Sequence, residues 1–149
     1  MPRLSAITAL LVLVVSTLTG CAQMSGAGRE WTTLIDGNTG LDNFNRLGDA
    51  NWRALDGAIV ADKGRGGFLV TKNSYKDFRL KAEFWAAPTT NSGIFIRGSQ
   101  LVVFFNGVQT VDVRDARFAQ GPFALQFANG ANNAPGGSIK WRKLQISAL

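Results

Sequence analysis

The chain has 149 residues and a formal net charge of +6, with 16 Lys and Arg against 10 Asp and Glu. It contains no histidine and one cysteine, Cys21, which excludes imidazole bases, Ser-His triads, internal disulfides and His-ligated zinc. Its positive charges are scattered, with no run longer than Arg142-Lys143, so we expect no binding of nucleic acid. Attraction to anionic envelope components is the simpler expectation.

The first 20 residues have the three parts of an export signal. Arg3 gives a short positive start, residues 7–15 are apolar except for Thr8, and Leu18-Thr19-Gly20-Cys21 follows. The apolar run is too short to span a membrane as a mature helix, so we expect a cleaved signal peptide helix over residues 1–20.

The four residues that end at Cys21 resemble the lipobox of bacterial lipoproteins, whose cysteine is acylated and becomes the new N-terminus. This resemblance implies a lipid anchor on Cys21. Ala22 follows it in place of Asp, which by the usual sorting rule favours the outer membrane, with the protein facing the periplasm. The alternative is an ordinary secretory signal with an incidental cysteine. Residues 21–30 would then be a lipidated flexible tether, and residues 31–149 one domain.

Beyond the tether, the sequence predicts antiparallel β-structure. Helical periodicity is nearly absent, and short alternating runs lie between turn residues, which is typical of an all-β sandwich. Residues 58–62 and 68–71 are predicted to be neighbouring strands across a Gly-rich turn. Residues 77–85 form the clearest strand. One of its faces carries Phe78, Leu80, Ala82 and Phe84, and the other carries Arg79, Lys81, Glu83 and Trp85.

A hairpin and two further strands follow a short strand predicted at residues 94–97. Residues 101–105 and 108–113 flank Asn106-Gly107, a strong hairpin signal. A two-residue turn pairs Phe105 with Val108 and Val103 with Thr110, and apolar residues on both faces suggest a hairpin covered on both sides.

The C-terminal strands show two further patterns. Phe123, Leu125 and Phe127 alternate along one strand. In the last strand, Leu144 and Ile146 are out of phase with Ile139 and Trp141, and a bulge near Arg142-Lys143 would restore the phase. We expect Trp31, Trp52 and Trp141 to lie in the core.

Seven segments, taken in order, resemble one family. They are Trp31-Thr32-Thr33-Leu34-Ile35-Asp36-Gly37, Trp52-Arg53-Ala54-Leu55-Asp56-Gly57-Ala58-Ile59, Tyr75-Lys76-Asp77-Phe78-Arg79-Leu80 with Glu83-Phe84, Asn91-Ser92-Gly93-Ile94-Phe95-Ile96-Arg97, the Asn106-Gly107 hairpin, Gly121-Pro122-Phe123-Ala124-Leu125-Gln126, and Ile139-Lys140-Trp141-Arg142-Lys143-Leu144-Gln145-Ile146. The chain is similar to the 3-keto-disaccharide hydrolase family. The resemblance implies a concanavalin-like (lectin-like) jelly-roll β-sandwich and a hydrolase or lyase that acts on 3-keto-glycosides.

One departure from the family pattern concerns the middle of the domain. Family members carry several dozen residues between the strand that ends here at Arg97 and the Asn-Gly hairpin, whereas here Gly98-Ser99-Gln100 leads straight into Leu101. We therefore expect the sandwich to lack central strands, with unpaired edges near residues 94–105 that favour self-association. A second departure follows Gln126, where many members carry a histidine.

The resemblance implies elimination from a 3-keto sugar. Such a site needs a base near C2, a cation for the enolate oxygen and an acid for the leaving oxygen. Glu83 is the candidate base, because Arg79 and Lys81 on its face would keep it ionised, and Trp85 would stack on the sugar ring. The alternative is a solvated face with ordinary cross-strand charge pairs.

Four further residues are candidates for sugar binding. Asn91, Ser92 and Arg97 would bind hydroxyl groups beside Gly93; alternatively they form a turn with an arginine on its rim. Gln126 points either into a sugar cleft or into water. Asp36-Gly37-Asn38 resembles a turn more than a calcium loop, so no metal site is assigned, and the sequence identifies no cofactor.

Three readings of function remain open at this point. The first is a membrane-anchored enzyme on 3-keto-glycosides with an incomplete active site. The second is a non-catalytic carbohydrate-binding lipoprotein, and the third is an internally deleted product without function.

Overall fold

The structure is a computed structural model that describes residues 30–98, 100–114 and 119–149. The expected signal peptide, Cys21 and most of the tether lie outside the described residues. The described chain is all-β, with two single 3-10 turns, η1 (Leu41–Asn43) and η2 (Ala131–Asn133). Its strands pair antiparallel. No helix among these residues has the length and hydropathy needed to cross a membrane.

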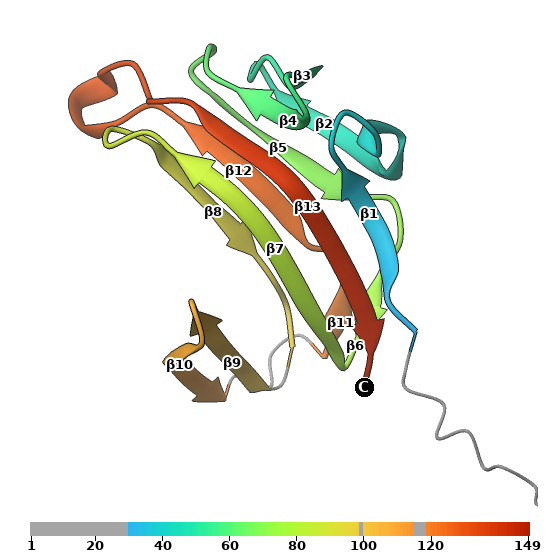
Figure 1. Cartoon of the computed structure of the whole chain (residues 1–149). Coiled ribbons are helices and arrows are strands. Elements are labelled where there is room, and N and C mark those ends of the chain that lie inside the picture. Colours follow the sequence, from blue (N-terminus) through green and yellow to red (C-terminus); the bar gives the residue numbers. More distant parts are fainter. Residues whose placement is uncertain (1–29, 99, 115–118) are drawn as a thin grey trace, which may run out of the picture.

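Two sheets make up most of the fold (Figure 1). In the first sheet, β13 (Ile139–Ala148) is central and pairs with β7 (Phe78–Ala86) along one edge. Its other edge pairs with β1 (Thr32–Asp36) and β4 (Ala58–Ala61), and β3 (Arg53–Leu55) pairs with β4. The second sheet has the order β2 (Phe44–Gly48), β5 (Gly66–Thr71), β12 (Ala124–Ala128) and β8 (Asn91–Phe95).

Two small two-stranded sheets complete the fold. One pairs β6 (Tyr75–Lys76) with β11 (Gln120–Gly121), and the other is the hairpin of β9 (Gln100–Phe105) and β10 (Val108–Arg114). The hairpin is hydrogen-bonded to neither large sheet within the described chain, and Figure 1 shows it standing apart from them.

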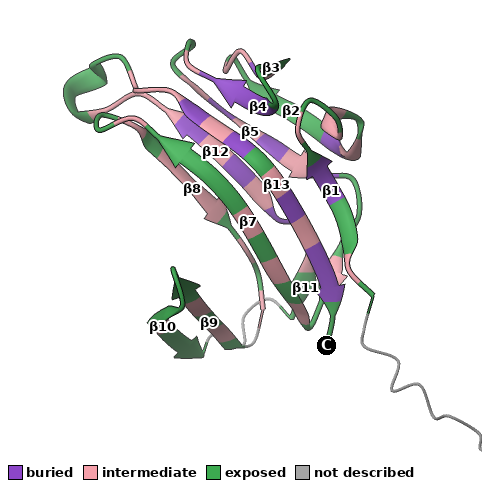
Figure 2. Ribbon diagram, in the orientation of Figure 1, coloured by how far each residue is buried: buried purple, intermediate pink, exposed green. Residues whose placement is uncertain are grey.

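The core lies between the two large sheets, where the buried positions of Figure 2 face one another. The first sheet contributes Ile35, Ile59 and Leu144, and the second contributes Leu125 and Phe127, each at most 1 % exposed. Because alternate residues of a strand point to opposite faces, the apolar phase of each strand decides which face is buried.

Two of the three tryptophans expected in the core are buried there. Trp52 and Trp141 are each 2 % exposed. The prediction was wrong for Trp31, which is half-buried, with Lys81 Nζ 4.2 Å from its ring centroid. The register explains this position. Thr33 pairs with Gln145 and Gln145 with Lys81, so these residues form one row on the outer face, and Trp31 precedes Thr33 by two residues on that face.

The bulge expected in the last strand is confirmed. The pairing of β13 with β7 shifts register between Trp141 and Lys143, so Arg142 is the extra residue. As a result, Ile139 and Trp141 before the bulge and Leu144 and Ile146 after it are all buried.

The predicted pairing of residues 58–62 with 68–71 was wrong. These segments are β4 and β5, and they belong to different sheets. The Gly-rich turn carries the chain from one sheet to the other, and Asp49 Oδ1 holds it by accepting hydrogen bonds of 2.9 Å from the backbone N–H groups of Arg65 and Gly66. Alternation in a sequence shows which face of a strand is buried, but not which strand lies beside it.

The hairpin turn is confirmed, but part of its register differs from the prediction. Phe105 pairs with Val108 as expected, whereas Val103 pairs with Val111 because the register shifts around Thr110. The hairpin is also not covered on both sides, since Phe104 is 61 % and Val108 66 % exposed. The strand predicted at 94–97 begins earlier, at Asn91, so Asn91-Ser92-Gly93 lies within β8 and does not form a turn.

Both large sheets end unpaired on the same side of the molecule. Within the described chain, β7 pairs only with β13 and β8 only with β12. A short connection, residues 87–90, joins the two edge strands. The unpaired sheet edge expected near residue 94 is therefore present in β8, and β7 forms a second unpaired edge.

Candidate functional site

Glu83 projects from the outer face of the first sheet, because Ala82 packs against the core and Phe84 contacts the buried ring of Trp141 on the other face of β7. Its carboxylate is ion-paired with Arg142, whose Nε lies 2.9 Å from Glu83 Oε2 and whose Nη2 contacts the same oxygen. Half of the Glu83 side chain is exposed. The cation beside Glu83 is thus the bulge residue of β13.

The two cations expected beside Glu83 lie elsewhere on the same face. Lys81 and Arg79 stack over the Trp31 ring, at 4.2 and 5.7 Å from its centroid. Such cation–π contacts stabilise an exposed site by about 0.5–1 kcal/mol each. Arg79 and Lys81 therefore attach the start of the domain to β7.

Glu83 and Arg142 line a shallow hollow of about 370 Å³. The remaining lining comes from three segments: Asp36 and Gly37 at the end of β1, Gly57 between β3 and β4, and Lys143 in β13. Both glycines have positive φ, +58° and +75°, which favours residues without a Cβ atom. The Gly57 N–H donates to Asn38 Oδ1 at 2.9 Å and ties these two turns together.

The hollow brings together two carboxylates and two cations. A carboxylate can accept a proton, and guanidinium and ammonium groups can stabilise an oxyanion. Every charged group here is partly solvated, and an exposed ion pair such as Glu83–Arg142 contributes only about 0–1 kcal/mol. Substrate oxygens can therefore compete with Glu83 for Arg142.

Trp85 lies further along the same outer face. Its side chain is 54 % exposed, and Lys140 Nζ lies 5.5 Å from its ring centroid. The ring is thus accessible to a flat apolar ligand surface, although it does not line the hollow beside Glu83.

The other predicted binding residues belong to the second sheet or its surroundings. Asn91 Nδ2 donates to the Asn129 carbonyl and Ser92 Oγ to the Gln126 carbonyl, both at 2.6 Å. These bonds attach β8 to β12 and to the loop after it. Arg97 lies across Gly121, where a Cβ atom would be 2.9 Å from Arg97 Cδ.

Gln126 also lies away from Glu83. Leu125 and Phe127 are buried in the core, so Gln126 points to the outer face of the second sheet. The two large sheets therefore place Glu83, Arg79, Lys81 and Trp85 on one outer face and Gln126 on the opposite one. The structure does not bring the predicted residues together in a single site.

Sequence reasoning missed Arg142 and Lys143 as neighbours of Glu83. The available signal was the phase break in β13, because a bulge residue is turned out of the regular alternation. Among the described residues there is no cluster of three or more carboxylate, His or Cys side chains that could hold a metal ion.

Comparison with known proteins identifies the family of one part of the chain. Residues 30–101 match the family model of the 3-keto-alpha-glucoside-1,2-lyase-like domain. Over this stretch the chain belongs to that family, which confirms the resemblance found in the sequence. The matched segment contains Glu83 and ends at the start of β9, whereas Arg142 and Lys143 lie outside it. No match is found among the curated proteins.

Proposed function

We propose that this protein is an envelope lipoprotein that cleaves 3-keto-glycosides by elimination in the hollow beside Glu83. The observation that carries the proposal is the coincidence of the family match with this hollow, in which Glu83, Arg142 and Lys143 meet. The scaffold in this proposal is a concanavalin-like jelly roll that lacks central strands. Two facing sheets with β7 and β8 unpaired on one side support that assignment.

The chemistry follows from the ketone. A carbonyl at C3 acidifies the proton on C2, and Glu83 removes that proton as a general base. Arg142 or Lys143 stabilises the enolate oxygen at C3. The electron pair then forms the C1–C2 double bond and expels the C1 oxygen, which takes up a proton as it leaves. Addition of water to the enone gives net hydrolysis.

A turnover assay on a 3-keto-glucoside tests this role of Glu83. The enone absorbs in the ultraviolet, so its formation can be followed directly. Glu83→Gln keeps the shape of the side chain and removes the base, and we expect kcat to fall by about 10²- to 10⁴-fold. Glu30→Gln, at the other glutamate of the chain, is the matched control and should keep wild-type turnover. Full activity in Glu83→Gln would move the base to another residue.

The second candidate function is sugar binding without catalysis. The observation in its favour is the exposed ring of Trp85, which offers a flat surface for a sugar ring. Gln126, which was predicted to bind the same sugar, lies on the second sheet, so the predicted residues do not form one catalytic site. Calorimetry with the same 3-keto-glucoside separates the two functions. Binding that depends on Trp85, without enone formation by the wild type, would replace the first proposal with this one. The absence of both binding and turnover would favour the third hypothesis, an internally deleted product without function.

A further inference from the structure

The outer face of the first sheet carries an excess of positive charge around the hollow. The charged side chains that project outward from β1, β7 and β13 comprise five cations and two carboxylates: Arg79, Lys81, Lys140, Arg142 and Lys143 against Asp36 and Glu83. Glu83 is paired with Arg142. Neither Lys140 nor Lys143 forms an ion pair within the described chain. A ligand of this face therefore meets unneutralised positive charge, which favours an anion.

Trp85 and Lys140 form the cross-strand row of side chains next to Glu83. The register pairs Lys140 with Trp85, and the residues on either side of Lys140 in β13 are buried in the core, so Lys140 points outward. Trp85 follows Glu83 by two residues on the same face, roughly 7 Å along the strand. A ligand that fills the hollow and extends along β7 thus reaches these two side chains, called here the Trp85–Lys140 pair.

The Trp85–Lys140 pair is open to a ligand. Trp85 is 54 % exposed, and Lys140 Nζ lies 5.5 Å from its ring centroid, close to the outer limit of about 6 Å for a cation–π contact. The ammonium group is thus held weakly and can turn to an incoming anion. Asp62, which follows the neighbouring strand β4, is already engaged, because Arg53 binds both oxygens of its carboxylate.

The row on the other side of Glu83 is closed. Trp31 is half-buried there, and its ring is covered by Lys81 at 4.2 Å and Arg79 at 5.7 Å. These contacts occupy the ring surface that a ligand would need. The part of a substrate that extends beyond the hollow is therefore directed toward Trp85.

We infer that the Trp85–Lys140 pair binds the leaving group of the substrate, and that this leaving group is a flat ring bearing a carboxylate. This role rests on the proposed function, which places the sugar ring beside Glu83. Trp85 stacks on the ring of the leaving group. Lys140 supplies the single positive charge that a carboxylate matches, in a charge-assisted hydrogen bond. Arg142 and Lys143 stay beside the sugar, where the enolate charge develops.

Two 3-keto-α-glucosides that differ in the charge of the leaving group test this assignment. One carries 4-carboxyphenol and the other its neutral analogue 4-carbamoylphenol. In the full chain carrying Cys21→Ser, which removes any acyl group, Lys140→Gln should lower kcat/KM for the carboxylate substrate about fivefold and leave the amide substrate unchanged. Comparing chains on the same substrate cancels the unequal leaving ability of the two phenols. Lys140→Arg keeps the charge and should retain most of the activity on the carboxylate substrate.

Lys72→Gln is the matched control, because it removes the same charge from an exposed position directly after β5 in the second sheet. It should change kcat/KM for neither substrate. Equal effects of Lys140→Gln on the two substrates, or the same effect from Lys72→Gln, would overturn the inference.

Glucosides without the ketone separate this inference from the proposed catalysis. Their C2 proton is not acidified, so they do not eliminate, and calorimetry can measure their binding. We expect 4-carboxyphenyl α-glucoside to bind about fivefold more tightly than 4-carbamoylphenyl α-glucoside, and Lys140→Gln to abolish this difference. Trp85→Ala should weaken the binding of both about fivefold.

The two measurements have distinguishable outcomes. A Lys140-dependent preference for the carboxylate, without enone formation from the keto substrates, would refute elimination at Glu83 and keep the Trp85–Lys140 pair as a binding site. Equal affinities for the two glucosides, or no binding of either, would overturn the inference even where turnover is observed.

Discussion

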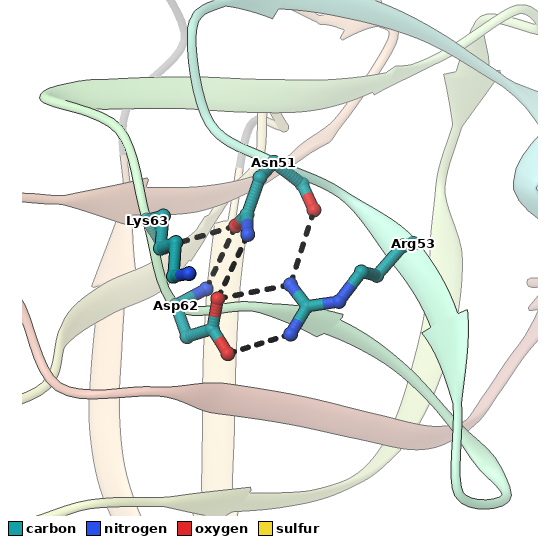
Figure 3. Close-up of polar contacts among 4 residues, drawn as sticks. All are labelled: Asn51, Arg53, Asp62 and Lys63. Atoms are coloured by element: carbon teal, nitrogen blue, oxygen red, sulfur yellow. Dashed lines mark hydrogen bonds and ion pairs between the residues drawn. The ribbon is translucent and has the colours of Figure 1, made fainter.

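At the scale of single residues, the best-connected carboxylate in the described chain is Asp62. Arg53 donates to both of its carboxylate oxygens, at 2.9 and 2.6 Å, and Asn51 Nδ2 donates to one of them at 2.8 Å (Figure 3). Asn51 Oδ1 also accepts from the backbone N–H groups of Asp62 and Lys63. The hydrogen bonds from Arg53, and then from Asn51, lower the pKa of Asp62 to about 2. This cluster fixes the start of the turn that leads from β4 to β5.

The lowered pKa of Asp62 makes part of the stability dependent on pH. Because the carboxylate is favoured in the folded state, its contribution is fully present above the unfolded pKa of about 4 and is lost as the pH falls towards 2. With the side chain about one-third exposed, we expect about 1 kcal/mol. Urea unfolding of Asp62→Asn should show that deficit at neutral pH and almost none near pH 2. Arg53→Gln should lose a similar pH-dependent part, and a deficit that persists at pH 2 would assign it to packing.

Cys21 lies outside the described residues, and its acylation is our proposal from the lipobox. Two or more acyl chains hold a protein firmly to a bilayer. We expect Cys21→Ser to move the protein from the membrane fraction to the soluble fraction. Ala22→Asp, which leaves the thiol in place, should keep it membrane-bound and move it from the outer to the inner membrane. Cell fractionation measures both, and full membrane retention of Cys21→Ser would rule out the anchor.

At the scale of elements, the bulge in β13 decides how the first sheet is packed. Without the extra residue Arg142, either the residues before it or those after it would point out of the core, because a slip of one residue exchanges the two faces of a strand. The same bulge brings Arg142 to Glu83. One local irregularity therefore serves both the core and the proposed site.

Deleting Arg142 should consequently be far more damaging than truncating its side chain. The deletion turns two of the buried residues Ile139, Trp141, Leu144 and Ile146 outward, and we expect a loss of about 3 kcal/mol or more. Arg142→Ala keeps the bulge and removes only an exposed ion pair, so its cost should be at most about 1 kcal/mol. Chemical denaturation compares the two variants. Similar losses would show that β13 tolerates the shift by moving the bulge.

At the scale of the whole molecule, the strands of the two large sheets carry most of the buried residues, and the β9–β10 hairpin carries none. β13 pairs with three other strands, and its buried side chains include Trp141, Leu144, Ile146 and Ser147. β9 and β10 pair only with each other within the described chain. The molecule thus combines a well-packed sandwich with a hairpin on which Phe104, Phe105 and Val108 are exposed.

Hydrogen exchange should report this difference directly. Peptides covering residues 100–114 should exchange at least ~100-fold faster than peptides from β13, because few buried contacts oppose their opening. Equal protection of the hairpin and β13 would mean that the hairpin is packed as firmly as the sandwich.

The sequence by itself determined the local properties of this protein. The all-β character, the apolar face of β7, the turn at Asn106-Gly107 and the bulge in β13 all follow from alternation and turn chemistry over a few residues. The family was also identifiable, because its motifs are short segments that keep their order. The general tendency of tryptophan to be buried predicted the positions of Trp52 and Trp141 but not that of Trp31.

Tertiary structure alone decided which strands are neighbours and which side chains meet. β4 and β5 are adjacent in the chain and lie in different sheets, while Glu83 and Arg142 are far apart in the chain and form an ion pair. Alternation along its strand correctly predicts that Gln126 faces away from the core. That outer face belongs to the second sheet, so Gln126 lies on the side of the molecule opposite Glu83. The physical reason is that a period of two residues records the face of a strand and carries no information about its sheet or partner. These are set by long-range pairing across the whole core.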